Sequence, residues 1–325
     1  MSKQHWLNLA VAAVSMTLIH AQALAQAYPT RAVTFIVPFA PGGGTDITAR
    51  TMAAKLGTKW GLSVIVDNRG GAAGIVGAEA AAKAKPDGYT LLIANVGITS
   101  INPALYAKLP YKPDSAFAPI SLICELPFVL MASPAFPPNS IKELVAYAKA
   151  KPGEVTFASS GSGGSPHLTA EIFQHATGTK MTHIPYKGGG PAMIDLMSGQ
   201  VNLLFASVLE GSGHIKAGKL KGLAVSHAKR SVALPDVPTL AEAGVKDAES
   251  GSWIALLAPA GTPPAIIARI EQDVKEAVAA PEVRERLIAQ GAIPQSSTPR
   301  ELQALIDADL ARYARIIREQ GLKVE

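Results

Sequence analysis

The feature that most constrains the fold is a repeated order of elements: a short apolar stretch, a glycine-rich loop and a segment with helical character. The first unit joins the apolar residues 33–37 (VTFIV) to the loop 38–44 and then to a predicted helix over 46–56. The second joins an apolar stretch at 64–66 to an alanine-rich predicted helix over 72–83. Strands that alternate with helices indicate parallel pairing, because a parallel pair needs a long crossover connection.

The same order continues along the chain. A third predicted strand, 91–94 (LLIA), is almost wholly apolar, as expected for a strand that is buried on both faces. After about residue 130 the pattern returns with a predicted helix over 141–149, for which Ser140 is the expected N-cap, and with a strand at 155–158. The whole pattern predicts an α/β protein with mostly parallel sheets and helices on both faces.

The last part of the chain has a different pattern. Apolar residues recur at helical spacing from Ile266 to Val278 and again from Leu302 to Ile317. We therefore predict two amphipathic helices that pack on a core.

The first 25 residues have the composition of a secretory signal peptide. Lys3 supplies a positive charge, residues 7–19 are mainly apolar, and small residues allow cleavage after Ala25 or after Ala27. The apolar stretch is short for a membrane span. We therefore expect an exported protein that is soluble in the compartment it reaches, and the sequence leaves the choice of cleavage site open.

The charge and the cysteine content exclude several classes of protein. The net charge is +5, and removal of Lys3 with the leader leaves 5 − 1 = +4, which suits a small anionic ligand. Lys and Arg form no run interleaved with aromatic residues, so we expect no nucleic-acid partner. Cys124 is the only cysteine; no internal disulfide can form, and its apolar neighbours predict a core position.

Three glycine-rich loops could bind an anion without a charged side chain. In the loop 38–46 (PFAPGGGTD), backbone N–H groups can point into one space, and the following helix adds its free N–H groups and positive dipole end. The loop 159–165 (SSGSGGS) adds hydroxyl donors, and the loop 186–190 (YKGGG) adds a ring and an ammonium. A tight turn with an N-cap explains one such loop, but three exceed what turn geometry requires.

Motifs for enzymatic chemistry are incomplete. The P-loop spacing at 213–220 ends in leucine, and the dinucleotide-like stretch 161–166 has proline in place of its third glycine. The histidines show no metal-ligand spacing. We therefore predict no metal, no cofactor and no catalytic residue. A hydrolase that uses Ser160 or Ser165 with His167 is an alternative for which no third partner is evident.

A family resemblance rests on seven stretches that occur in a fixed order over nearly the whole chain after the leader. These stretches are 28–31 (YPTR), 37–46 (VPFAPGGGTD), 66–74 (VDNRGGAAG), 86–91 (PDGYTL), 159–167 (SSGSGGSPH), 185–188 (PYKG) and 258–263 (APAGTP). In this combination the chain resembles the Bug-type periplasmic solute-binding proteins that serve tripartite tricarboxylate transporters.

The resemblance implies a Venus-flytrap fold of the periplasmic-binding-protein type. Two α/β domains would be joined by two crossing segments, which we place near residues 126–129 and 247–253, with the ligand in the cleft between the domains. Domain 1 would comprise residues 28–126 plus 250–325, and domain 2 would comprise residues 127–249. The tail helices would then return to pack on domain 1.

The resemblance also implies where the ligand binds. Its carboxylate would be held by the first strand–helix loop and by the corresponding loops of domain 2, through backbone amides, hydroxyls and water. Carried over by position, the implied ligand-binding residues are Phe39, Gly43, Gly44, Thr45, Asp46, Ser159, Ser160, Ser165, His167, Tyr186, Lys187 and Ser207. We expect Asp46 to order its loop rather than to touch an anion, because two negative charges repel each other.

The implied function is that of an extracytoplasmic binding protein, not an enzyme. It would be a monomer that captures a small organic carboxylate and delivers it to membrane transporter subunits. A periplasmic sensor subunit that docks on a membrane regulator would show the same sequence features. The sequence identifies neither the ligand nor the cognate membrane partner.

Overall fold

The computed structural model describes residues 28–321, so the predicted signal peptide at 1–25 lies outside the described residues. The strands are β1 Val33–Val37, β2 Val64–Asn68, β3 Thr90–Asn95, β4 Phe117–Ala132, β5 Thr156–Ser159, β6 Thr182–Pro185, β7 Leu203–Ser207, β8 Lys221–Val225, β9 Gly251–Pro259 and β10 Ile293–Pro294. The α-helices are α2 Gly44–Trp60, α3 Ile75–Ala82, α4 Asn102–Leu105, α5 Ile141–Ala150, α6 Ser165–Thr177, α7 Gly189–Ser198, α8 Val208–Lys216, α9 Pro264–Ala279, α10 Pro281–Ala289 and α11 Pro299–Gln320. A 3₁₀ turn, η1 (Ala72–Gly74), and a π turn, η2 (Gly97–Ile101), complete the elements described.

The strands join into one long sheet in the order β2–β1–β3–β9–β4–β7–β5–β6, and β8 and β10 pair with β4 off this path. The outer strands pair in parallel, as β1 does with β2 and β3, and as β5 does with β6 and β7. The central strands β4 and β9 pair antiparallel with their neighbours. The sequence pattern therefore predicted the alternation of strands and helices, but it did not reveal the antiparallel centre.

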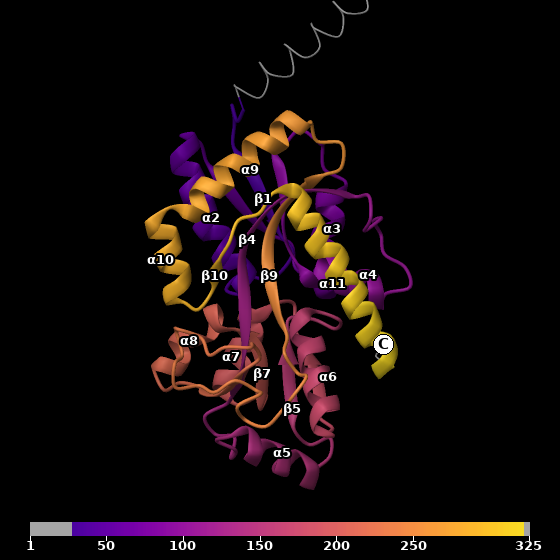
Figure 1. Ribbon diagram of the computed structural model, residues 1–325, viewed down its shortest axis with the longest axis vertical. Helices are drawn as coiled ribbons and strands as arrows, with labels where there is room; N and C mark the ends of the chain where they lie inside the picture. The colour runs from indigo at the N-terminus through magenta and orange to yellow at the C-terminus, as the bar shows by residue number, and fades with distance from the viewer. Residues whose placement is uncertain (1–27, 322–325) are drawn as a thin grey trace, which may run out of the picture.

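Strand β4 divides the sheet into two halves, which Figure 1 shows one above the other. It pairs with β9 from Phe117 to Pro127 and with β7 from Phe128 to Ala132. The chain returns to the upper half at β9, where Gly251 lies opposite Pro127. Because the pairing partner of β4 changes between Pro127 and Phe128, we propose that domain 1 comprises residues 28–126 plus 250–325 and domain 2 comprises residues 127–249. β4 and the segment that leads into β9 would be the two crossings.

Helices cover both faces of the sheet. In the upper half, α2, α9 and α10 bury Met52, Ile270 and Leu287 against one face, while α3 and α11 cover the other. In the lower half, α5 and α6 bury Leu144 and Phe173 on the face that α3 and α11 also cover. The hydrophobic core on this face is continuous from the upper half to the lower half. Apolar packing therefore links the two halves, in addition to the backbone.

Local sequence signals set several helix ends. Ser140 caps α5 as predicted, because its hydroxyl accepts a hydrogen bond from the Glu143 N–H. Thr298 and Glu301 form a capping box at the start of α11. The alanine-rich stretch begins as the turn η1, with Ala72 and Ala73 at positive φ, so its helix starts later than the composition suggests.

Three elements differ from the sequence-based expectation. The first predicted helix starts two residues earlier and ends four residues later than expected, at Trp60, and the left-handed Gly61 caps its end. β4 spans 16 residues, although only its apolar centre stood out in the sequence. Helix α10 was not predicted, because its pattern is short and largely charged.

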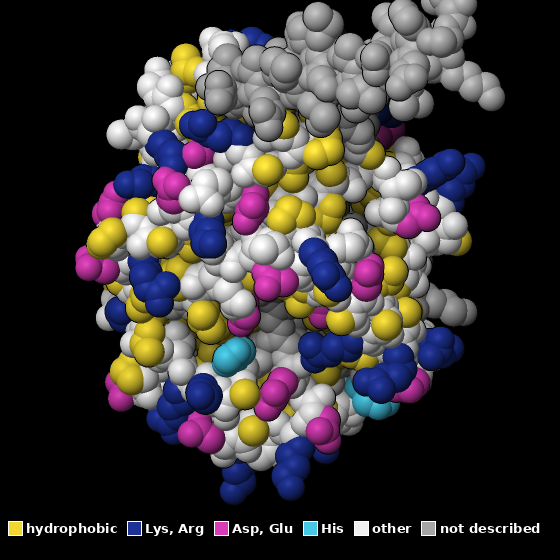
Figure 2. Space-filling view, turned by 45° about the horizontal axis from the view of Figure 1, so that its top comes forward, with side chains coloured by type: hydrophobic (Ala, Val, Ile, Leu, Met, Phe, Trp, Pro, Cys, Tyr) yellow, Lys and Arg dark blue, Asp and Glu magenta, His cyan; other side chains and the backbone are white. Residues whose placement is uncertain are grey.

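The surface carries charges of both signs. On the face in Figure 2, Lys and Arg side chains alternate with Asp and Glu rather than gathering in one patch. Within residues 28–321, no helix combines the length and the apolar character that crossing a membrane would require.

The buried Asp273 joins α9 to α2 and generates the first prediction. Its carboxylate accepts hydrogen bonds from Trp60 at 2.8 Å and Arg269 at 2.9 Å, and it pairs with Lys59 at 2.8 Å. Burial opposes its ionisation, but these partners outweigh burial and lower its pKa. Asp273→Asn should therefore lower the free energy of unfolding by about 1–3 kcal/mol at neutral pH.

The prediction includes a pH dependence. A carboxyl group whose pKa is lower in the folded state than in the unfolded state stabilises the folded protein at pH values above the unfolded-state pKa. This stabilisation is lost as the pH falls from the unfolded-state pKa through the folded-state pKa. The difference between wild type and Asp273→Asn in urea unfolding should therefore shrink toward low pH. Glu276→Gln is the control, because Glu276 contacts the same Lys59 from the exposed surface and should cost little. An equal effect of both variants would contradict this role of Asp273.

Candidate functional site

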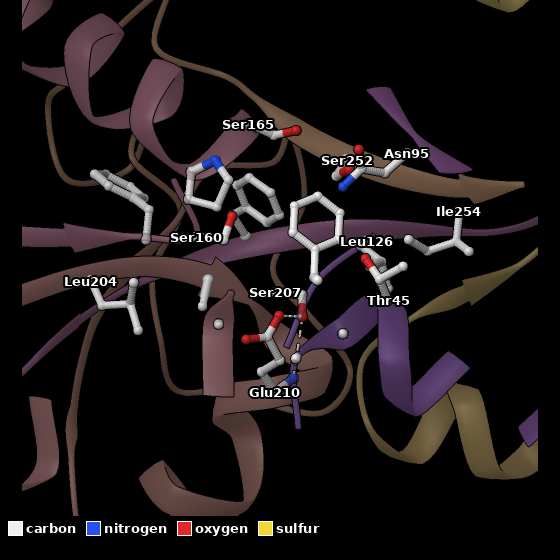
Figure 3. A pocket seen from close by; sticks show the side chains of 18 residues that line it. Thr45, Asn95, Leu126, Ser160, Ser165, Leu204, Ser207, Glu210, Ser252 and Ile254 are labelled. Atoms are coloured by element: carbon white, nitrogen blue, oxygen red, sulfur yellow. Dashed lines mark hydrogen bonds between the residues drawn. The ribbon is translucent and has the colours of Figure 1, made fainter. Parts of the chain in front are cut away.

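A small cavity lies between the two halves of the sheet, beside β4 and β9. Its volume is about 40 Å³, room for a few water-sized groups. Figure 3 shows hydroxyl side chains on several sides of it, with Ser160 and Ser165 across from Ser207 and Thr45. The lining consists of Phe39, Gly43, Gly44, Thr45, Asn95, Leu126, Phe128, Ser160, Ser165, Pro166, Gly189, Leu204, Phe205, Ala206, Ser207, Glu210, Ser252 and Ile254.

Four helices begin at this cavity: α2, α6, α7 and α8 each contribute their first residue, or the residue before it, to the lining. Three of them start after a glycine N-cap, at Gly43, Gly164 and Gly188. The first N–H of α2, at Gly44, donates to the Glu210 side chain, and no side chain caps α6 or α7 within the described chain. Unpaired N–H groups and the positive ends of helix dipoles therefore face one space. This arrangement favours an anion.

Backbone contacts across the cleft hold the two halves close together. The Ala40 N–H of the upper half donates to the Lys187 carbonyl of the lower half at 3.0 Å. Any Cβ at Gly190 would collide with the Pro41 carbonyl oxygen, and a Cβ at Gly44 would lie 2.6 Å from the Ser207 hydroxyl oxygen. The structure is therefore a closed form, in which glycines on both sides permit the close approach.

Asp46 lies behind the first loop and orders it. Its carboxylate accepts hydrogen bonds from the Gly42 N–H, from Arg50 and from Asn68, all near 3 Å. Burial opposes ionisation, but these three donors outweigh burial and lower the Asp46 pKa. Asp46 is not among the residues that line the cavity.

The second loop rests on a stack of two histidines. The rings of His167 and His183 stack with centroids 3.9 Å apart, and His183 lies 2.6 Å from the Ser159 hydroxyl. Burial, together with the neighbouring His167, lowers the pKa of His183 to about 3, so its ring is neutral. The Gly163 N–H donates to His167 Nδ1 at 3.0 Å, so a neutral His167 ring carries its proton on Nε2, which lies 3.5 Å from Glu171. Neither ring nitrogen is then free to accept a proton from a serine.

This arrangement does not assemble the catalytic pair considered above. Within the described residues, neither Ser160 nor Ser165 forms a hydrogen bond to His167. Ser159 does contact a histidine, but it is fully buried and its hydroxyl also bonds within its own loop, to Gly161. The two histidines therefore support the loop 159–165 through their contacts with Ser159 and Gly163.

The third loop contributes less of its side chains to the cavity than the resemblance implied. Tyr186 points to α7, where its hydroxyl bonds the Asp195 carboxylate at 2.6 Å. Burial, with that carboxylate, raises the Tyr186 pKa to about 12. Lys187 is exposed, and only its backbone takes part in the closure.

The structure therefore brings together part of the set named from the sequence. The residues of that set that line the cavity are Phe39, Gly43, Gly44, Thr45, Ser160, Ser165 and Ser207. The residues that surround or support the cavity instead are Asp46, Ser159, His167, Tyr186 and Lys187. The assignment of ligand-binding roles stays a proposal for both groups.

Sequence reasoning missed the polar residues Asn95, Ser252 and Glu210. Asn95 ends β3, and Ser252 lies on β9, where nothing in the surrounding sequence marks a loop. Glu210 stands three residues after Ser207, a spacing typical of a helix start. The Ser207 hydroxyl does accept from the Glu210 N–H, but the glutamate side chain also reaches the cavity.

Two buried oxygen atoms in the cavity lack a hydrogen-bond partner in the described structure: the Ser165 hydroxyl oxygen and Oε2 of Glu210. Buried polar atoms are rarely left unpaired, because doing so costs roughly 1–3 kcal/mol each. Both atoms are therefore available for a hydrogen bond to a molecule bound in the cavity.

The comparisons with known proteins identify the family of this chain. The family described as the tripartite tricarboxylate transporter family receptor (TctC) matches residues 48–322. Protein BugT of Bordetella pertussis is 39% identical over 308 residues, which cover 94% of each chain. The chain therefore belongs to the TctC family of receptors, which confirms the resemblance seen in the sequence.

Solved structures give the same result for the fold. A protein of R. palustris solved with adipate has 35% identity and a TM-score of 0.88, with 91% of this chain and 99% of that chain covered. MatC from Rhodopseudomonas palustris, solved with bound malate, has 33% identity and a TM-score of 0.85, with 89% and 100% covered. These likenesses confirm the predicted periplasmic-binding-protein fold, and the family and fold are those of solute-binding proteins.

The close approach of glycines generates the second prediction. Gly190→Ala should disfavour the closed form, because the added Cβ meets the Pro41 backbone across the cleft. Overpacking of this kind costs about 1–3 kcal/mol. In small-angle scattering, the variant should keep a larger radius of gyration than the wild type under conditions that make the wild type compact.

The matched control is Gly213→Ala, also in a helix, where nothing lies within 4 Å of the added Cβ. This control should behave as the wild type. A Gly190→Ala protein as compact as its control would show that the cleft closes without this contact.

Proposed function

We propose that this protein binds one small carboxylate in the cleft between its two halves and delivers it to membrane subunits of a tripartite tricarboxylate transporter. The observation that carries this proposal is the convergence of four helix starts on one cavity, two of which, α6 and α7, have no side-chain cap in the described structure. An anion satisfies such N–H groups without a charged side chain.

The chemistry of the lining supports a carboxylate with a short apolar body. Its hydroxyl groups, from residues such as Thr45, Ser160 and Ser165, can donate to carboxylate oxygens. The remaining walls, including Phe39, Leu126 and Ile254, are apolar and suit a hydrocarbon chain. The adipate and malate complexes of the R. palustris proteins are compatible with this class of ligand.

Neutral donors also suit a receptor that must release its ligand. Hydrogen bonds from backbone and hydroxyl groups become stronger when closure removes water, and they weaken when the cleft reopens. Closure is favoured only by a ligand that binds the closed form better than the open one. We propose that the protein acts as a monomeric receptor in the periplasm, after export directed by residues 1–25, and that it has no hydrolase activity.

The third prediction tests the ligand class. The protein, first unfolded and refolded to remove any bound small molecule, should be stabilised by at least one mono- or dicarboxylate. At a ligand concentration 100 times the Kd, the gain is about 2.7 kcal/mol. With an unfolding entropy of about 2.1 cal/mol/K per residue, this raises the Tm of a protein of about 300 residues by about 4 °C. A broad panel of carboxylates without any shift in calorimetric melting would overturn the proposed function.

The fourth prediction tests the site. Ser165→Ala should weaken binding of the stabilising carboxylate by about 1–3 kcal/mol, because the Ser165 hydroxyl is buried and unpaired without a ligand. Ser160→Ala and Thr45→Val should weaken it by a similar amount if each donates to the carboxylate. Isothermal titration calorimetry measures these changes.

Ser133→Ala is the matched control for Ser165→Ala. The Ser133 hydroxyl is also buried and unpaired in the described structure, but it does not line the cavity. Its removal should leave binding unchanged. Unchanged affinity in the Ser165, Ser160 and Thr45 variants would place the ligand elsewhere.

A further inference from the structure

Glu210 places an ionisable carboxyl group at a cavity that otherwise contains no charged side chain. Its Oε1 accepts a hydrogen bond from the Ser207 hydroxyl at 3.0 Å, and the Gly44 N–H from the opposite half of the molecule also donates to this carboxyl. Its Oε2 is buried, has no partner in the described structure and lies against Gly189. Figure 3 shows the Glu210 carboxyl beside Ser207.

This pattern of contacts is that of a neutral carboxylic acid. One oxygen accepts hydrogen bonds as a carbonyl does, and the other lacks the donors that an ionised carboxylate would attract. Lys, Arg and His are absent from the residues that line the cavity in the described part of the chain. Burial is the largest influence on Glu210 and raises its pKa, although the hydrogen bonds from Gly44 and Ser207 oppose it.

A second negative charge in the cavity would further favour the neutral form of Glu210. If the cleft holds a ligand carboxylate, an ionised Glu210 would repel it at close range, because no buried cation separates them. A protonated Glu210 would instead donate a hydrogen bond from Oε2 to a ligand oxygen, so that Oε2 gains the partner it lacks. This inference rests on the proposed function, since it concerns the same ligand and the same cavity.

We propose that Glu210 is the residue that couples ligand capture to proton uptake: it binds in its neutral form and donates a hydrogen bond from Oε2 to an anionic oxygen of the ligand. The proton comes from the solvent, and no covalent bond of the ligand changes. The ligand class follows from this role. It is a carboxylate without an ammonium group near Glu210, because a cation there would favour the ionised side chain.

The charged and titratable groups on the elements around α8 do not supply a competing partner. On α2, Asp46 and Arg50 pair with each other. On β4, Glu125 faces a separate cavity on the hinge side, and Cys124 is buried in the upper core. On β8, Lys221 bonds the Phe136 carbonyl, and β7 carries no titratable residue.

The remaining groups belong to α8 itself and to the loop and helix beside it. These are His214 and Lys216 in the last turn of α8, Tyr186 and Asp195, which bond each other, and the exposed Lys187. None of them lines the cavity.

The fifth prediction compares Glu210→Gln with the wild type. Glutamine keeps one acceptor and offers a permanent N–H donor, so it imitates the neutral acid at every pH. The ligand is malate, adipate or the panel carboxylate that gives the largest thermal shift. The pH range lies between the pKa of Glu210 in the free protein and its higher pKa in the complex. Over this range the affinity of the wild type for the ligand should fall as the pH rises. The limit is about tenfold per pH unit, because one proton is involved.

Glu210→Gln should bind with an affinity that does not change over the same range, above about pH 6, where the ligand carboxylates are ionised. Calorimetry in two buffers of different ionisation enthalpy should show proton uptake on binding to the wild type but not to the variant. Glu210→Ala, which offers no donor, should bind roughly tenfold to a hundredfold more weakly at low pH. Glu125→Gln, at the hinge-side cavity, should keep the wild-type pH dependence.

The outcomes separate the two proposals. Loss of binding in Glu210→Gln, with wild-type affinity that rises with pH, would mean that an ionised Glu210 binds a cationic ligand group, and it would overturn the inference. Equal and pH-independent binding of both proteins without proton uptake would overturn it as well. If no carboxylate binds the wild type or any variant at any pH, the proposed function itself fails.

Discussion

The two halves of the molecule depend on one strand that belongs to both. β4 is long enough to pair with β9 in the upper half and with β7 in the lower half, and its middle residues, Leu126 and Phe128, line the cavity. The proposed crossing and one wall of the cavity are therefore the same segment of chain. A change in the angle between the halves should alter the cavity, because both halves and the cavity share this strand.

The anion binding that we propose for the cavity uses backbone geometry rather than charged side chains. Glycines precede α2, α6 and α7; the first N–H of α2 donates to Glu210, and the first N–H groups of α6 and α7 are left free for another acceptor. The same lack of side chains lets the two halves approach, as at Gly44 and Gly190. The proposed anion recognition and the close approach of the halves thus use the same glycines, and a larger side chain there should impair both.

The sequence predicted the parts of this structure that local patterns encode. Alternating apolar strands and helices, the cap at Ser140 and the glycine-rich loops all follow from short-range chemistry, and the family resemblance placed the loops around one cleft. The sequence did not reveal the length of β4 or the role of Glu210. An antiparallel central strand and a side chain that reaches across to Gly44 depend on contacts between segments far apart in the chain, which no local pattern records.

Glu210 shows why a single buried carboxyl matters in such a site. In a cleft lined by neutral donors, one ionised group changes the net charge by a full unit, and no lining cation compensates it. The free energy of that charge depends on whether water still reaches it, so opening and closing the cleft shift the balance between the ionised and neutral forms. The protonation state, the closure of the two halves and the presence of an anion are consequently linked at one residue.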